Sequence, residues 1–171
     1  MILNKSGNLR GITHGESRTR LFQAWNAMKK RCYCKSNTTY RNYGARGISV
    51  CQEWRDSYEA FRDWALANGY RDDLELDRRD NNGNYEPSNC RWATRRQQMA
   101  NTRPRKGLSS QFKGVSWSKA VNKWRAQIRI NGATAHLGVF ASEEEAARTY
   151  DKAAYEAHRD FAHLNFPTER Y

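Results

Sequence analysis

The sequence has 171 residues, which is room for one medium-sized domain or two small ones. It contains 30 Lys and Arg against 18 Asp and Glu, a net charge of +12, and an excess of this size favours polyanionic partners. It shows neither an apolar run of transmembrane length nor an apolar N-terminal signal. We therefore expect a cytoplasmic protein that is not secreted. Its expected partner is nucleic acid, rather than a membrane or a small-molecule substrate.

Residues 1–15 are polar and without periodicity, so we expect a mobile arm there. An apolar helical face predicts an amphipathic helix over 17–33; its members are Leu21, Phe22, Trp25, Met28 and Cys32. A second apolar face predicts a helix near 56–68, which Gly69 is placed to end.

Residues 74–92 have the pattern of a hairpin. Two short apolar strands flank a turn-rich loop at 80–84, and Thr94 is placed to cap a short helix that runs to about Asn101. The predicted unit is strand, loop, strand and helix.

The four cysteines are Cys32, Cys34, Cys51 and Cys90. Their spacing is not that of a paired zinc knuckle, although a composite zinc site with His14 is conceivable. Isolated cysteines are more often small buried apolar side chains. We therefore expect no disulfide, no zinc, and buried side chains at Cys32, Cys51 and Cys90.

A basic linker is predicted at 103–110, where Pro104, Gly107 and two serines interrupt any periodicity. The chain has six basic residues and no acidic one from Arg91 to Lys106. The segment either lies along a phosphate backbone or is a solvated hinge. In the first case the contacts come from Arg95, Arg96, Arg103, Arg105 and Lys106.

After the linker the hydrophobic period changes to two. Strict alternation over 123–130 predicts a strand with one covered and one open face, and Asn131-Gly132 predicts a hairpin turn into a strand at 133–140. An earlier strand is predicted at 111–117. Ser142 and Glu145 form a capping box that opens a helix to about 159, whose alanine stripe can approach the covered face closely.

The open face of this sheet is predicted to be basic, with the members Lys113, Lys119, Lys123, Arg125, Gln127 and Arg129. Alternate strand residues lie about 6.6 Å apart, close to two base-pair rises. Arginine can bind guanine, glutamine can bind adenine, and lysine can neutralise phosphate. The alternative is an exposed basic strand that is only solvated.

Residues 111–167 resemble the ethylene-response-factor (Apetala-type) DNA-binding domain. The matching stretches are Phe112–Val115, Lys123–Ile128, Leu137–Phe140, Glu144–Ala154 and Leu164–Pro167. The resemblance implies three antiparallel strands packed on one helix, with the sheet in the major groove of DNA. This chain has His136 where that family has a DNA-facing Trp, so the base sequence recognised by the family does not carry over.

Residues 76–80 and 89–98 resemble the HNH motif of phage homing endonucleases, over about 14–103. The resemblance implies a metal held by Asp77 and Gln98, a bracing Asn at Asn89, and a catalytic base at the position of Arg78. Oxygen ligands suit Mg²⁺ or Mn²⁺. Arginine stays protonated and cannot act as the base, so either Asp80 serves or the domain does not cut.

The fold class expected is α+β: an HNH-like ββα-metal module with flanking helices over 12–102, the linker at 103–110, and the sheet-and-helix module over 111–168. The expected function is a site-specific, metal-dependent, homing-type HNH endonuclease, a hydrolase of double-stranded DNA from a phage or mobile element, acting as a monomer. The alternative is a catalytically inactive HNH-like regulator that binds DNA. A third interpretation makes Asp77, Arg78, Arg79 and Asp80 a surface ion-pair cluster that pins the hairpin.

Overall fold

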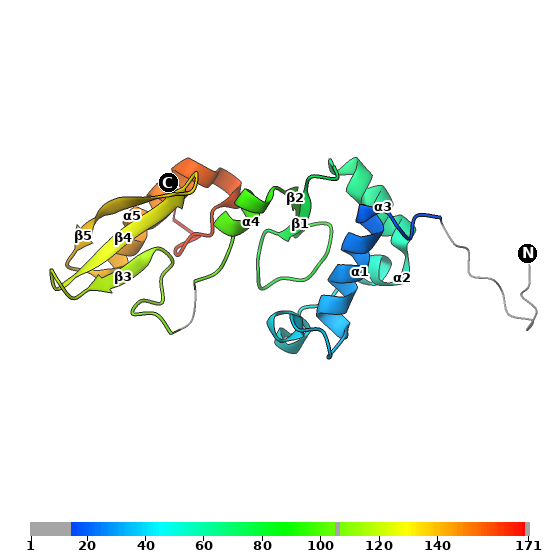
Figure 1. The fold of residues 1–171 in the computed structure, drawn as a ribbon, viewed down its shortest axis with the longest axis horizontal. Helices are drawn as coiled ribbons and strands as arrows, with labels where there is room; N and C mark the ends of the chain where they lie inside the picture. Colours follow the sequence, from blue (N-terminus) through cyan, green and yellow to red (C-terminus); the bar gives the residue numbers. More distant parts are fainter. Residues whose placement is uncertain (1–14, 105–106, 170–171) are drawn as a thin grey trace, which may run out of the picture. The chain divides into compact units, whose positions relative to one another are not determined.

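The computed structural model describes residues 15–104 and 107–169, and the predicted N-terminal arm therefore lies almost wholly outside the described residues. The chain divides into two compact units, Met1–Trp92 and Ala93–Tyr171 (Figure 1). The predicted α+β class is confirmed, with helices beside a two-stranded and a three-stranded sheet. The boundary lies before the helix at 95–100, so this helix belongs to the second unit. In the described residues no helix has the length and apolar character needed to cross a membrane.

The first unit is built on three helices: α1 (Arg20–Tyr33), α2 (Gln52–Asp56) and α3 (Tyr58–Ala67). Helix α1 begins later than predicted because the Thr19 hydroxyl caps it by accepting from the Phe22 amide. The helix predicted near 56–68 is confirmed by α3, and the separate short helix α2 precedes it. Ser57 is extended and caps α3 through its hydroxyl, which separates α2 from α3.

A two-stranded sheet of β1 (Glu75–Arg78) and β2 (Cys90–Ala93) confirms the predicted hairpin, and two short 3₁₀ turns at Tyr40–Asn42 and Gly44–Arg46 precede it. The core of this unit is aromatic. Phe61 is fully buried with its ring 5.2 Å from that of Trp54, and Trp92 joins the same cluster. Because this core has few aliphatic residues, large aromatic rings fill much of its volume.

The cysteines of the first unit mostly line its interior. Cys32 and Cys90 are buried as predicted, and burial raises the pKa of the Cys32 thiol to about 11 and that of Cys90 to about 12. Cys51 is only partly buried and Cys34 is exposed. Thiols with raised pKa values are poor metal ligands and poor nucleophiles at neutral pH.

The second unit begins with α4 (Arg95–Ala100), where Thr94 and Gln97 form the reciprocal bonds of a capping box. The strands β3 (Val115–Ser118), β4 (Lys123–Ile130) and β5 (Ala133–Phe140) pair antiparallel in that order. The strand predicted at 111–117 was too long at its start, because Gly114 has a φ of +76° and breaks the extended chain.

Helix α5 (Glu143–His158) covers one face of this sheet, followed by a 3₁₀ turn at Arg159–Phe161 (Figure 1). Ala146, Ala147 and Ala154 are buried against the sheet, as the alanine stripe predicted. Small side chains let the helix axis lie close to the strands. On the sheet side of the interface the buried residues are Val115, Ala126 and Ile128.

A buried carboxylate fastens the chain end to this module. Asp151 has no exposed surface, and its two oxygens accept from the backbone amides of Asn165 and Phe166 and from the Asn165 side chain, at 2.8–2.9 Å. Asn165 also accepts from the Lys113 amide and donates to the Lys113 carbonyl. The segment before β3 and the segment after α5 are thereby joined.

A β-bulge interrupts β5. Ala126 is opposite Gly138, but Gln127 is opposite His136, so Leu137 is an extra residue in β5. The bulge resets the alternation, and Thr134 and His136 fall on the same side of the sheet as the polar residues of β4.

Candidate nucleic-acid interface

We use the term open face for the side of the three-stranded sheet that α5 does not cover. Its members are Lys123, Arg125, Gln127 and Arg129 of β4 and Thr134, His136 and Val139 of β5. The register places Arg125 opposite Val139, Gln127 opposite His136 and Arg129 opposite Thr134. The intervening Ala126 and Ile128 are buried against α5, so the alternation along β4 has the predicted phase.

The positive charges of the open face are not neutralised by carboxylates of this unit. The strands β3, β4 and β5 contain no Asp or Glu. Lys123, Arg125 and Arg129 are exposed, as is Lys119 in the preceding turn, and none of the ion pairs among the described residues involves them. Unpaired exposed cations on one face form a positive surface that attracts phosphates.

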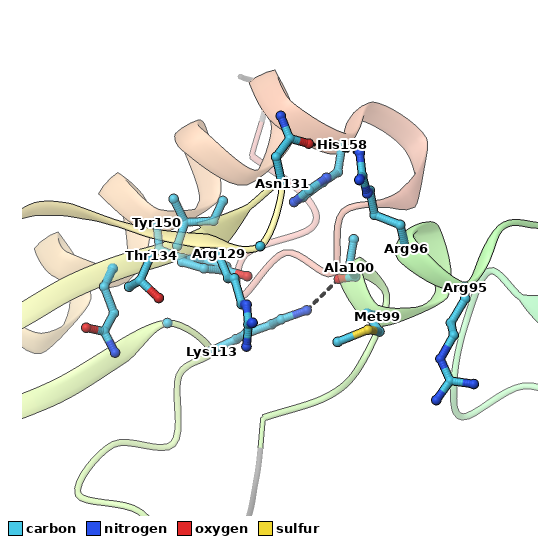
Figure 2. A pocket seen from close by; sticks show the side chains of 14 residues that line it. Arg95, Arg96, Met99, Ala100, Lys113, Arg129, Asn131, Thr134, Tyr150 and His158 are labelled. Carbon is cyan, nitrogen blue, oxygen red and sulfur yellow. Dashed lines mark hydrogen bonds between the residues drawn. The ribbon is translucent and has the colours of Figure 1, made fainter.

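Lys113 does not belong to the open face, contrary to prediction. It precedes β3, so the alternation of the strand does not extend to it. Its side chain is half-buried and its ammonium donates to the Ala100 carbonyl at the end of α4 (Figure 2). Burial lowers the pKa of Lys113 to about 8.

The basic residues after the hairpin occupy different settings. Arg95 and Arg96 are exposed on α4, and Arg96 donates to the Asn131 side chain at 2.9 Å, which joins α4 to the β4–β5 turn. Arg103 is exposed, whereas Arg105 and Lys106 lie outside the described residues. The DNA contacts predicted for this segment stay a prediction.

The hairpin residues that resemble the HNH motif are engaged within the first unit. Asp77 is buried, and its carboxylate accepts from the Arg91 guanidinium at 3.0 Å. A buried ion pair of this kind is costly to break, because either partner alone would be an uncompensated charge. A carboxylate held in this way does not fit an open magnesium site.

Arg78, at the position expected for the base, is a buried structural residue. Its guanidinium donates to the Gly83 carbonyl at 2.7 Å and lies 5.0 Å from the ring of Tyr43 and 4.8 Å from that of Tyr85. These contacts hold the loop between β1 and β2 against the aromatic residues of the unit.

Asn89 braces that loop. Its side chain accepts from the Asp80 amide at 2.8 Å and donates to the carbonyls of Asp80 and Asn84, at 3.1 and 2.8 Å. The Asp80 side chain is exposed, and one of its oxygens accepts from the Asn82 amide. These bonds cross the loop, which presents the Asp80 carboxylate to solvent.

Gln98 lies on α4 in the second unit, whereas Asp77 lies in the first. Among the described residues there is no group of three His, Cys, Asp or Glu side chains that could hold a metal ion. Sequence reasoning also missed Val139 and Thr134 on the open face. Their place depends on the bulge at Leu137, and the local signal for it is Gly138 within the strand, which has a φ of +139°.

The comparisons with known proteins concern only part of the chain. It is similar to an ethylene-responsive transcription factor-like protein of Arabidopsis thaliana. The two are 37% identical over 76 residues, which is 44% of this chain and 30% of the plant protein. No family model and no solved structure matches. The similarity supports the predicted resemblance to the ethylene-response-factor domain, and these comparisons offer no support for the HNH resemblance.

Proposed function

We propose that this protein binds duplex DNA and that the open face of β3–β4–β5 enters the major groove. The observation that carries the proposal is the arrangement of β4, where exposed Arg125 and Arg129 flank Gln127 on a face without carboxylates. A two- or three-stranded surface can enter the major groove, which is about 12 Å wide. The similarity to a transcription factor-like protein supports the same conclusion.

The chemistry of the face fits base recognition as well as phosphate binding. Arginine can bind the O6 and N7 atoms of guanine with two hydrogen bonds, and glutamine can bind the N6 and N7 atoms of adenine. Gln127 and His136 are cross-strand partners near the middle of the face. Because His136 stands where the plant domain has Trp, we expect a target sequence different from that of the plant family.

The test starts with selection of duplex sites from a random library by the full chain. Arg125→Ala and Arg129→Ala should then weaken binding to the selected site by about 1–3 kcal/mol each. Lys152→Ala is the matched control, because it removes an exposed cation from α5 on the covered side of the sheet. Loss of a phosphate contact should also reduce the slope of log K against log salt concentration by about one, whereas loss of a base contact should leave this slope unchanged. Equal binding by all three variants would exclude the open face.

Site-specific, metal-dependent cleavage is a second candidate function, and the alternative is a regulator that binds without cutting. The exposed Asp80, on the loop that Asn89 braces, favours cleavage, because carboxylate oxygens suit Mg²⁺ or Mn²⁺. The buried pairing of Asp77 with Arg91 does not fit, so we assign no catalytic step.

Nicking of a plasmid that carries the selected site, over a manganese titration, separates the two. Cleavage that Asp80→Asn abolishes while duplex binding persists would support an endonuclease. Absence of cleavage on a site that the wild-type protein demonstrably occupies would support the regulator.

A further inference from the structure

A pocket of about 700 Å³ lies between α4 and the edge of the sheet, within the second unit (Figure 2). It exists because β3 pairs with β4 only as far as Ala126. From Gln127 onward, β5 still pairs with one edge of β4, whereas the edge that β3 leaves faces the pocket, which α4 and the turn around Gly114 also line. The volume is in the range of pockets that bind small organic ligands.

The walls of the pocket are cationic. Arg95, Arg96, Lys113 and Arg129 line it, and the described lining residues include no Asp or Glu. Arg95 and Arg129 take part in none of the ion pairs of the described chain. A concave site with several cations and no carboxylate favours an anionic ligand.

The pocket also has an apolar side. Ile128 and Tyr150 line it from the sheet and α5, and Met99 from α4. Met99 is 59% exposed on a six-residue helix whose other side chains are polar except for Ala100. A flexible thioether exposed at the mouth of a pocket suits contact with a planar or apolar ligand group. Gln127 adds an amide that can pair with the edge of a base.

We infer that this pocket binds a nucleoside phosphate, with the phosphate against Lys113 and Arg129 and the base against Met99 and Ile128. The ligand has two sources with the same chemistry: a free mononucleotide, or one unpaired nucleotide of a DNA strand held on the open face. The second source rests on the proposed function, because Gln127 and Arg129 belong both to the pocket and to the open face. Extrusion of a single nucleotide from a duplex costs only a few kcal/mol, and least where it is already unpaired.

The free nucleotide is tested by calorimetry with deoxyadenosine monophosphate and the full chain, with inorganic phosphate and deoxyadenosine as partial probes. We expect the mononucleotide to bind more tightly than either part. Arg129→Ala should weaken its binding about tenfold, and Met99→Ala about fivefold. Arg125→Ala is the matched control, because Arg125 lies on the open face outside the pocket. It should leave mononucleotide binding unchanged while weakening duplex binding.

The second source, an unpaired nucleotide of a DNA strand, is tested with two duplexes of the selected sequence. One duplex is fully paired and the other has a single bulged nucleotide. A preference for the bulged duplex that Met99→Ala removes would identify DNA as the source. Mononucleotide binding without such a preference would identify the free nucleotide.

Three results would overturn the inference. One is the absence of both mononucleotide binding and a preference for the bulged duplex, and a second is binding that neither Arg129→Ala nor Met99→Ala changes. The third is binding of inorganic phosphate as tight as that of the mononucleotide, which would indicate a bare phosphate site. Failure of the proposed function is separate, because it would appear as loss of binding to the fully paired duplex while the calorimetric experiment is unaffected. Circular dichroism of each variant verifies that it is folded.

Discussion

Replacement of Arg78 by Ala should destabilise the first unit by about 3–5 kcal/mol. The guanidinium is buried, donates to the Gly83 carbonyl at 2.7 Å, and lies about 5 Å from two tyrosine rings, those of Tyr43 and Tyr85. A hydrogen bond from a charged group contributes about 1.5–3 kcal/mol. Each cation–π contact contributes about 0.5–2 kcal/mol, and the sum is reduced because the contacts share one group.

The assay is urea unfolding of the full chain, with hydrogen exchange of peptides from 75–93 to locate the loss. Arg79→Ala is the matched control: the residue is the next one along the chain, is exposed, and should change stability by less than about 0.5 kcal/mol. Arg78→Lys keeps the charge but loses the planar stacking, so it should recover only part of the stability.

If Arg78→Ala and Arg79→Ala differ by less than about 1 kcal/mol, Arg78 does not hold the loop, and the argument from the tyrosine contacts fails. A large loss of stability in Arg78→Ala would also show that this position is needed for the fold. It would explain why the position resembling the catalytic base carries a residue that cannot accept a proton.

Three further predictions concern the second unit. Asp151→Asn removes the charge that three donors of Asn165 and Phe166 share, and should cost about 2–4 kcal/mol in thermal unfolding; an unchanged melting temperature would contradict this. Gly114→Ala should cost at least about 3 kcal/mol, since φ is +76° and an added Cβ would lie 1.9 Å from the Tyr150 ring; wild-type urea stability would refute it. Lys113 has a pKa of about 8, below its usual 10.5, so the unfolded chain binds more protons between these values. From pH 8 to 10.5 the unfolding free energy of wild type should therefore rise by about 2–3 kcal/mol relative to Lys113→Met, and equal slopes would show that Lys113 is not buried.

The elements with local signals could be predicted from the sequence. Strands β4 and β5 have the predicted bounds because both signals, the alternation of apolar and polar residues and the Asn131-Gly132 turn, lie within a short stretch of sequence. Helix α5 begins at the predicted cap, Ser142, for the same reason. These signals need no knowledge of the rest of the chain.

The remainder depends on contacts between distant segments. The setting of Lys113 includes the Ala100 carbonyl, which accepts from its ammonium, and the Asn165 side chain, which bonds its backbone, and both are near Lys113 only in the folded unit. The ion pair of Asp77 with Arg91 likewise needs the hairpin to be closed. Motif matching assigned chemical roles to Asp77 and Arg78, whereas the tertiary environment of each residue determines whether the role is open to it.

The bulge at Leu137 makes β5 two segments whose phase relative to each other is set by one extra residue. Loss of that residue would bring His136 next to Gly138 in an unbroken register, still opposite Gln127, so 133–136 would keep their present faces. An extra residue in a strand without a bulge would instead turn the following segment over. The bulge therefore lets β5 carry one residue more than its partner strand without changing which of its side chains lie beside Gln127 and Arg129.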